Sequence, residues 1–430
     1  MASAGSSASL PSECHLIVIT HGMWGNPSHV GELARVIKET HPGPELHVLR
    51  PQSNREENTY DGIDWGGERV VQEIIDEVAE LKREGRTVTR FSITGYSLGG
   101  LVARYTVGIL QQRGFFETIT PVNFNTIATP HLGVPRMPSS FFSSLASLIG
   151  PRLLSRTGEQ FYCVDKWLKD RPLLEVMADP DQIFYQSLAN FHSIRIYANA
   201  VNDTTVPYVT AAIEVNDPFI SRATNGIQVE LDDKYSPRVQ AYNVPEVPPP
   251  PESKPMVFTP KWFKSIKFTR PPLPPWLTFR FPFNYVVYLM IPLLIPTVLS
   301  LTLFRLAVAT RSSRLRIKLL EEDAASPGSV ERLAQVLAKL ESQVESTVLD
   351  LVEETSADDD SSPNKVQPLL TTVQRRIAAN LNKLPITKEI AYFPTIRFAH
   401  AVIVCRDVRN FEWHKAGENI VKHWSTVFIL

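Results

Sequence analysis

Apolar segments alternate with amphipathic segments along the first half of the chain. Residues 28–40 and 67–84 place apolar side chains at helical spacing. Shorter segments have the length and composition of strands buried on both faces of a parallel sheet, and they lie at 15–20, 46–49, 121–128 and 194–198. This alternation predicts an α/β fold, in which helices wrap a mostly parallel central sheet.

The pattern changes after residue 240. Residues 241–280 are rich in proline and in basic residues, which predicts an extended linker. Residues 281–304 carry no charged side chain and are long enough to span a bilayer. We therefore expect an apolar, membrane-associating segment at 281–310, inserted before the last part of the fold.

The C-terminal part divides into two predicted units. Residues 311–367 are expected to form a charged helix, at 329–353, and an acidic, serine-rich loop. Residues 368–430 are expected to return to the α/β core that begins with residues 13–240, through a helix at 368–384 and a strand or strand end at 395–405.

Residues 137–178 follow a predicted strand end and are rich in serine, phenylalanine and leucine. We expect them to be helical. Two interpretations stay open: a lid or acyl-binding cap over a site at the strand ends, or plain packing helices.

Composition limits the possible partners and compartments. A net charge of -1 gives no reason to expect a nucleic-acid partner. The three cysteines are far apart and odd in number, which favours a reducing, cytosol-facing location over a disulfide framework. The first 13 residues lack the basic and apolar regions of a secretory signal. Because no cluster has metal-ligand spacing, we expect neither a metal nor a cofactor.

Residues 95–99 read Gly-Tyr-Ser-Leu-Gly and match the pattern G-x-S-x-G. An apolar strand with Phe91 and Ile93 precedes the motif, and an apolar helix that includes Leu101 follows it. The glycines remove side chains that would collide with a serine raised on a sharp strand-to-helix turn. The helix N-terminus behind that serine favours developing negative charge. The pattern predicts Ser97 as a nucleophile of the α/β-hydrolase type.

A serine nucleophile needs a base within hydrogen-bond reach and an acid that orients the base. In α/β-hydrolases the acid follows the serine along the chain. Asp203 stands just after the predicted strand at 194–198 and is our candidate acid. Asp165, Asp179 and Asp181 are alternatives that fit helix caps or surface charges better.

The base comes last in the chain order of these enzymes. Only His400, His414 and His423 follow Asp203. We select His400 because it borders an apolar element, whereas the other two lie near exposed charges.

The segment His-Gly-Met-Trp-Gly at 21–25 follows the first predicted strand, where these hydrolases place an oxyanion donor. The donors would be the backbone N–H of Leu98 and that of Met23 or Trp24, of which we assign Met23. The His21 side chain itself is interpreted as structural.

These motifs together resemble the DUF676 family of serine esterases, which have a lipase-like domain. The segments that carry the resemblance are 21–25, 95–104, Thr-Pro-His-Leu-Gly at 129–133, Asn-Asp at 202–203 and Val-Pro at 206–207, with 380–385 and 399–404 similar to the family's histidine region. Within the family the chain looks most like fungal lipid-droplet phospholipases and monoacylglycerol lipases. The resemblance covers 13–210 well and 368–425 more weakly, and it implies Ser97 as nucleophile, Asp203 as acid and His400 as base.

The apolar segment lies between Asp203 and His400, which must meet in one site. One full crossing of a bilayer would separate them. We therefore expect the segment to enter and leave by the same face, with Pro292 and Pro296 at the bend, or to lie in the interface. The alternative is a buried core helix with two kinks.

The resemblance implies a lipid-surface serine hydrolase that cleaves carboxylic esters of glycerolipids, of the phospholipase or monoacylglycerol lipase type. It further implies a lipid-droplet or endoplasmic-reticulum location, with the catalytic part facing the cytosol. Two other functions stay open: an acyltransferase with the same acyl-enzyme, and a catalytically idle scaffold on lipid droplets. The oligomeric state is not predicted.

Overall fold

The computed structural model describes residues 12–136, 149–249, 283–324 and 367–430. The expected charged helix at 329–353, most of the linker at 241–280 and the first part of the 137–178 segment lie outside the described residues.

The central sheet has six strands, all parallel, in the order β2-β1-β3-β4-β5-β8. The strands are β1 (Ser12–Thr20), β2 (Leu46–Leu49), β3 (Arg86–Tyr96), β4 (Thr120–Ile127), β5 (Ser193–Asn199) and β8 (Ile386–Ala391). A separate antiparallel hairpin consists of β6 (Gln228–Leu231) and β7 (Val239–Asn243). The predicted α/β-hydrolase fold with a mostly parallel sheet is confirmed.

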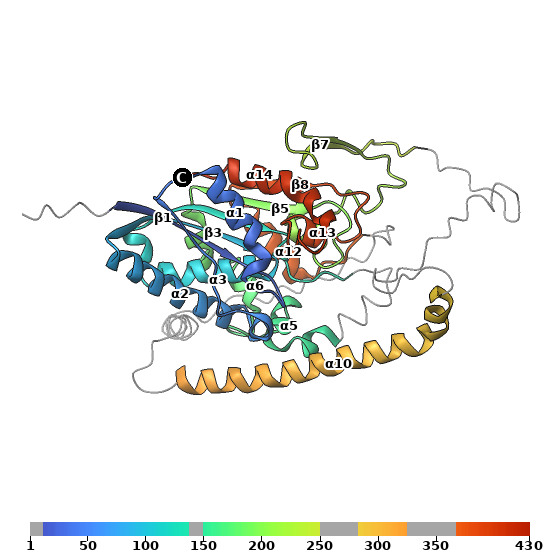
Figure 1. Cartoon of the computed structure of the whole chain (residues 1–430), viewed down its shortest axis with the longest axis horizontal. Helices are drawn as coiled ribbons and strands as arrows, with labels where there is room; N and C mark the ends of the chain where they lie inside the picture. The colour runs from blue at the N-terminus through green and yellow to red at the C-terminus, as the bar shows by residue number, and fades with distance from the viewer. Residues whose placement is uncertain (1–11, 137–148, 250–282, 325–366) are drawn as a thin grey trace, which may run out of the picture.

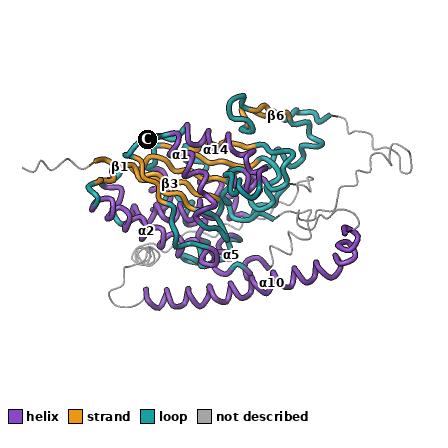
Figure 2. The backbone as a smooth tube through the Cα atoms, in the orientation of Figure 1, coloured by secondary structure: helices purple, strands orange, loops and turns teal. Residues whose placement is uncertain are grey.

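Helices cover both faces of this sheet (Figure 1 and Figure 2). Along β1, Leu16 and Val18 belong to the apolar core under α2 and α3, whereas Ile17 and Ile19 belong to the core under α1 and α14. This alternation is the period of two that a strand imposes, and it explains why the segment is apolar throughout. The larger helices are α1 (Gly31–Thr40), α2 (Ile63–Arg83), α3 (Leu98–Gln112), α12 (Thr372–Leu381) and α14 (Glu418–Thr426).

Short helices connect these elements. They are η1 (Pro27–Val30), η2 (Glu56–Tyr60), η3 (Phe115–Glu117), α5 (Ser155–Phe161), α6 (Leu173–Val176), α7 (Ile183–Ala189), α8 (Tyr208–Ala211), α13 (Ala399–Val402) and η5 (Glu412–Gly417). The described part of the 137–178 segment is thus a set of brief helices joined by loops.

The C-terminal part completes the sheet, because β8 pairs with β5. The strand expected at 395–405 is wrong: this segment contains the short helix α13. Its residues are apolar because Ala399, Val402, Ile403 and Val404 pack into the core beside α14. Periodicity cannot separate a short buried strand from a short buried helix, which explains the error.

The apolar segment forms one long helix, α10 (Phe283–Ala324), with Pro292 and Pro296 inside it. The expected hairpin is therefore wrong, because a proline removes one local hydrogen bond and kinks a helix without reversing the chain. From Pro292 to Ala324 the helix is long and apolar enough to cross a membrane, and 11% of its most apolar window is buried. That exposure also contradicts the alternative of a buried core helix. In Figure 1, α10 runs along the outer side of the domain, below α5.

Candidate active site

Ser97 occupies the sharp turn between β3 and α3. Its backbone has φ 57 and ψ -127, a conformation that ordinary residues rarely adopt. The turn is tight: a β-carbon on Gly95 would lie 2.3 Å from the Cα of Gly100, and one on Gly99 would lie 2.5 Å from the carbonyl oxygen of Thr20. Only glycine fits at both positions, which is the physical meaning of the G-x-S-x-G spacing.

The structure brings Ser97, His400 and Asp203 together in a hydrogen-bonded chain. His400 Nε2 lies 3.0 Å from Ser97 Oγ, and His400 Nδ1 lies 2.9 Å from Asp203 Oδ2. Ser97 follows β3 directly, Asp203 lies in the loop after β5, and His400 lies in the short helix α13 after β8, so all three are at the carboxyl edge of the sheet. This is the geometry in which a histidine can take a serine proton while a carboxylate fixes its tautomer.

Four hydrogen bonds hold the Asp203 carboxylate. Its Oδ1 accepts the backbone N–H groups of Thr205 and Val206, at 3.0 and 2.8 Å. Its Oδ2 accepts the amide of Asn199, at 2.8 Å, besides the contact with His400. A carboxylate held at both oxygens cannot rotate, so it presents a fixed acceptor to the imidazole.

The alternative acids lie elsewhere. Asp165 Oδ2 accepts the N–H of Leu173 at the start of α6, and burial raises the pKa of this carboxyl to about 6. Asp179 forms an ion pair with Arg171, and its other oxygen accepts the N–H of Asp181.

The alternative histidines lie elsewhere too. His414 Nδ1 accepts the N–H of Asp407, and His423 Nδ1 lies 3.0 Å from the hydroxyl of Tyr197. Neither contact involves Ser97.

Two residues that the sequence did not single out support the histidine loop. Tyr96 donates its hydroxyl to the backbone carbonyl of His400, at 2.9 Å, and the two rings lie 5.1 Å apart. Burial raises the pKa of the Tyr96 phenol, so this donor stays protonated. Asn202 holds the same segment, because its side-chain amide donates to the backbone carbonyl of Phe393 at 2.7 Å and its backbone carbonyl accepts the N–H of Ala399. Both residues adjoin a predicted site residue and lie in segments that resemble the family, which is the signal that could have found them.

The loop after β1 passes directly against the nucleophile. A β-carbon on Gly22 would lie 2.7 Å from Ser97 Cβ. The backbone N–H of Trp24 is already engaged, since it donates to Thr59 Oγ1 at 3.1 Å. Within the described part of the chain, the N–H of Met23 has no such acceptor.

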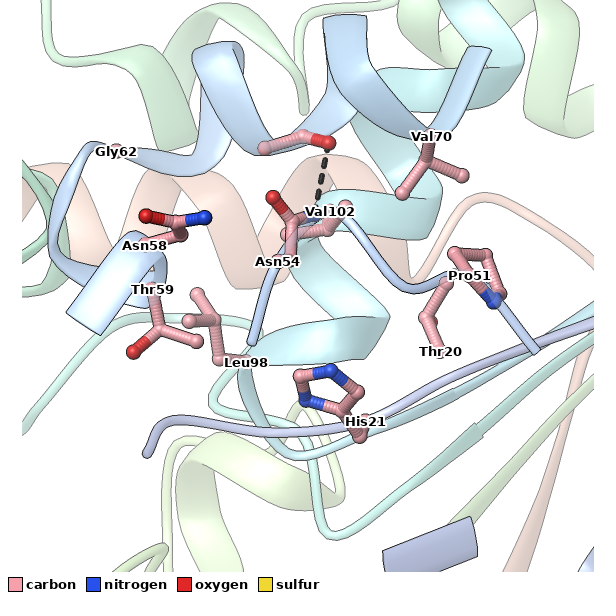
Figure 3. Close-up of a pocket in the computed structure, with 11 residues that line it drawn as sticks. Thr20, His21, Pro51, Asn54, Asn58, Thr59, Gly62, Val70, Leu98 and Val102 are labelled. Carbon is pink, nitrogen blue, oxygen red and sulfur yellow. Dashed lines mark hydrogen bonds between the residues drawn. The ribbon is translucent and has the colours of Figure 1, made fainter. Parts of the chain in front are cut away.

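A small enclosed cavity lies behind Leu98 (Figure 3), between the end of β1 and α2. Its volume is about 10 Å³, which is room for one water molecule and excludes a lipid. His21 lines it, with Nδ1 3.0 Å from the carbonyl of Gly22, and burial lowers the pKa of this imidazole. These contacts agree with a structural histidine that packs behind the turn.

Ser97 opens onto a much larger cavity of about 800 Å³. This volume is typical of a site for a ligand of drug or lipid-chain size. Its walls are mainly apolar and include Met23, Trp24, Leu154, Phe161, Tyr162, Val201, Val206 and Phe219. Such walls bind hydrocarbon and exclude water. Among the described residues, no group of three or more histidine, cysteine or acidic side chains could hold a metal ion.

Residues 11–215 match the model of a family described as "Putative serine esterase (DUF676)". The predicted resemblance is confirmed. The chain is also similar to "Putative lipase C4A8.10" of Schizosaccharomyces pombe, with 32% identity over 47% of this chain and 26% of that protein. "Putative lipase ROG1" of Saccharomyces cerevisiae is 26% identical over 46% of this chain and 28% of that protein.

The chain spans about a quarter of the length of these curated relatives. Among solved structures, it is similar to the phospholipase PlaB from Legionella pneumophila in complex with thio-NAD, with a TM-score of 0.28 and 16% identity. That likeness covers 46% of this chain and 41% of the phospholipase and is too low to carry an argument. The fold assignment rests on the sheet order and on the turn at Ser97.

Proposed function

We propose that this protein is a serine hydrolase that cleaves carboxylic esters of glycerolipids at a membrane surface. The observation that carries the proposal is the hydrogen-bonded chain from Ser97 through His400 to Asp203, at the wall of a large apolar cavity. The family description and the relatives' names, which speak of esterases and lipases, support the same reaction class.

In this mechanism Ser97 Oγ attacks the acyl carbonyl carbon while His400 Nε2 accepts the hydroxyl proton. Asp203 stabilises the imidazolium. The N–H groups of Met23 and Leu98 stabilise the oxyanion, and each donor of this kind contributes about 3 kcal/mol to transition-state stabilisation. His400 then protonates the leaving alcohol. Water, activated by the same imidazole, attacks the acyl-enzyme, releases the fatty acid and restores Ser97.

The helix α10 supplies the proposed contact with the membrane. Its later part is pinned to the domain: Thr310 donates to the carbonyl of Leu153 at 2.5 Å, and Arg316 pairs with the buried carboxylate of Asp61 at 2.9 Å. Only the part before residue 305 is left to enter lipid. From Phe283 to Phe304 this part is about 33 Å long at roughly 1.5 Å per residue, whereas one leaflet of the hydrocarbon core is about 15 Å thick. The helix therefore stays in one leaflet only if it lies strongly tilted or along the interface. A single-leaflet insertion keeps Asp203 and His400 on the same side and suits a lipid droplet or the cytosolic face of the endoplasmic reticulum.

The test is a panel of monoacylglycerols and phospholipids in vesicles, assayed with purified wild type and Ser97→Ala. We expect fatty-acid release by the wild type, a loss of at least a thousandfold in the variant, and fluorophosphonate labelling that needs Ser97. A wild type that stays unlabelled and inactive would overturn the proposal in favour of a scaffold. Labelling with acyl transfer to a lipid alcohol, and no incorporation of labelled water, would make it an acyltransferase.

A further inference from the structure

A second hollow lies beside the active-site cavity, between α10 and η2. Its volume is about 430 Å³. One wall comes from the loop and helix around η2 and the other from α10, and the lining residues are Trp24, Glu56, Glu57, Tyr60 and residues 304–306, 308 and 309. We call it the α10 groove. Trp24 lines both hollows, so its side chain borders the groove as well as the cavity of Ser97.

Trp24 is more exposed than is usual for a tryptophan beside an apolar cavity. Its side chain is 54% exposed although it adjoins an apolar cavity. The indole Nε1–H donates to the hydroxyl of Tyr60 at 2.7 Å, which aims the ring along η2. An aromatic ring held at one polar point with its faces open is suited to contact with a hydrocarbon chain beside it.

The groove has a fixed width, because α10 is held at a set distance from η2. Arg316 donates to both oxygens of Asp61 and to the carbonyl of Glu57, which belongs to η2. Asp61 is fully buried and pairs with Arg69 as well. Loss of a partner from a buried ion pair is strongly unfavourable, so these bonds hold the two walls in register.

The groove is continuous with the exposed apolar surface of α10. Phe304, which lines its outer end, is 66% exposed, and Leu301 and Leu299 continue the apolar surface away from the domain. Glu56, Glu57 and Arg305 also line the groove and supply charged groups. Apolar and charged groups side by side match an acyl chain that has a polar head group.

We propose that the α10 groove is the passage by which a lipid acyl chain moves between the membrane and the Ser97 cavity, sliding past the indole of Trp24. This inference rests on the proposed function and adds to it the route and the part of the substrate that the route recognises. A short, soluble ester has no need of this passage, because the Ser97 cavity is itself partly open and the exposed residues Thr204 and Thr205 are among those that line it.

The test fills the groove. Val308 lines it and is 51% exposed, so Val308→Trp adds bulk there without disturbing the core. The matched control is Leu315→Trp, at an exposed position of the same helix outside the groove. The two substrates are p-nitrophenyl acetate in solution and p-nitrophenyl palmitate carried in phosphatidylcholine vesicles.

We expect Val308→Trp to lower kcat/KM for the palmitate at least tenfold and to change that for the acetate less than twofold. Leu315→Trp should change neither, and both variants should bind vesicles as the wild type does. Equal effects on the two esters, or no effect on either, would overturn the passage while leaving the hydrolase intact. If wild type shows no Ser97-dependent hydrolysis of the acetate, the proposed function itself fails.

A second measurement uses Ser97→Ala with vesicles of phosphatidylcholine that carries a photoreactive diazirine on its acyl chain. We expect adducts at Trp24 or within 304–309, and their loss in the Val308→Trp background. Adducts confined to 292–303 would overturn the proposal. If Val308→Trp abolishes dimerisation but does not change the difference in kcat/KM between the two esters, the groove binds a second copy of the chain. That result would also overturn the proposal.

Discussion

The carboxyl edge of the sheet and the helix α10 differ in how their polar and apolar side chains are placed. At the sheet edge the polar side chains of the site are held by hydrogen bonds, as the four bonds to Asp203 illustrate. In α10 the pattern is inverted: among the described side chains from Leu289 to Phe304 most apolar ones are exposed, and the polar groups that anchor the helix, Thr310 and Arg316, contact the domain. In the proposed function, the first region carries out the reaction on any ester, and the second affects only substrates that reside in lipid.

The largest effect is expected at the acid. Asp203→Asn keeps the shape but removes the charge that fixes the imidazole tautomer, so kcat/KM should fall about 10⁴-fold for soluble and vesicle-borne esters alike. Asp179→Asn, at an alternative acid paired with Arg171, is the matched control and should stay near wild type. Similar losses in both variants would contradict the assignment.

A smaller loss, again for both kinds of ester, is expected from Gly22→Ala. The new β-carbon would lie 2.7 Å from Ser97 Cβ and 3.1 Å from its Oγ, so the loop that carries Met23 has to move. Loss of one oxyanion donor lowers kcat by about 10² to 10³. Gly31→Ala is the control, because the nearest atom to its β-carbon is Arg50 Nη1 at 3.5 Å. Full activity of Gly22→Ala would refute the close approach.

The two halves of α10 can be compared by one substitution at two exposed leucines. Leu299→Asp places a charge in the part proposed to enter lipid and should weaken binding to phosphatidylcholine vesicles about tenfold or more. Leu319→Asp, at a residue of similar exposure on the pinned half, should leave binding unchanged. Hydrolysis of a soluble ester should be unaffected in both. If both variants lose vesicle binding equally, the division of the helix is wrong.

The smallest effect concerns stability rather than activity. Burial lowers the pKa of His15 on β1 to about 4, and its Nε2 lies 2.8 Å from Ser92 Oγ. Since the unfolded histidine has a pKa of about 6.5, the unfolded state binds more protons between these values. The folded state therefore loses stability as pH falls below 6.5, by up to about 1.4 kcal/mol per pH unit for this group. Urea unfolding at pH 7.5 and 5.5 should show a smaller pH dependence in His15→Gln than in wild type.

The sequence was most informative where local chemistry decides the structure. The glycines around Ser97 predict a tight turn, and the apolar residues of β1 predict a strand that is buried on both faces. The fold prediction was confirmed. Chain order narrowed the base to three histidines, of which the apolar element beside His400 selected that residue, and the position after a predicted strand selected Asp203. The structure places the two together; their catalytic roles stay a prediction.

Distant contacts were beyond such reasoning. Nothing near Arg316 indicates that it pairs with Asp61, because the two are 255 residues apart. The same holds for Tyr96 and the carbonyl of His400, 304 residues apart. Two other interpretations were wrong because the local sequence is ambiguous. The short buried helix α13 is as apolar as a strand, and the two prolines in α10 suggested a reversal of the chain that the helix does not make.

The position of β8 in the chain has a consequence for biosynthesis. The sheet is closed at its edge by residues 386–391, and His400 follows them, so both leave the ribosome after all of α10. Domains fold as their residues emerge. Under the proposed function, the nascent chain therefore exposes its apolar helix before the proposed general base is translated, and contact with a lipid surface can form before the active site is complete.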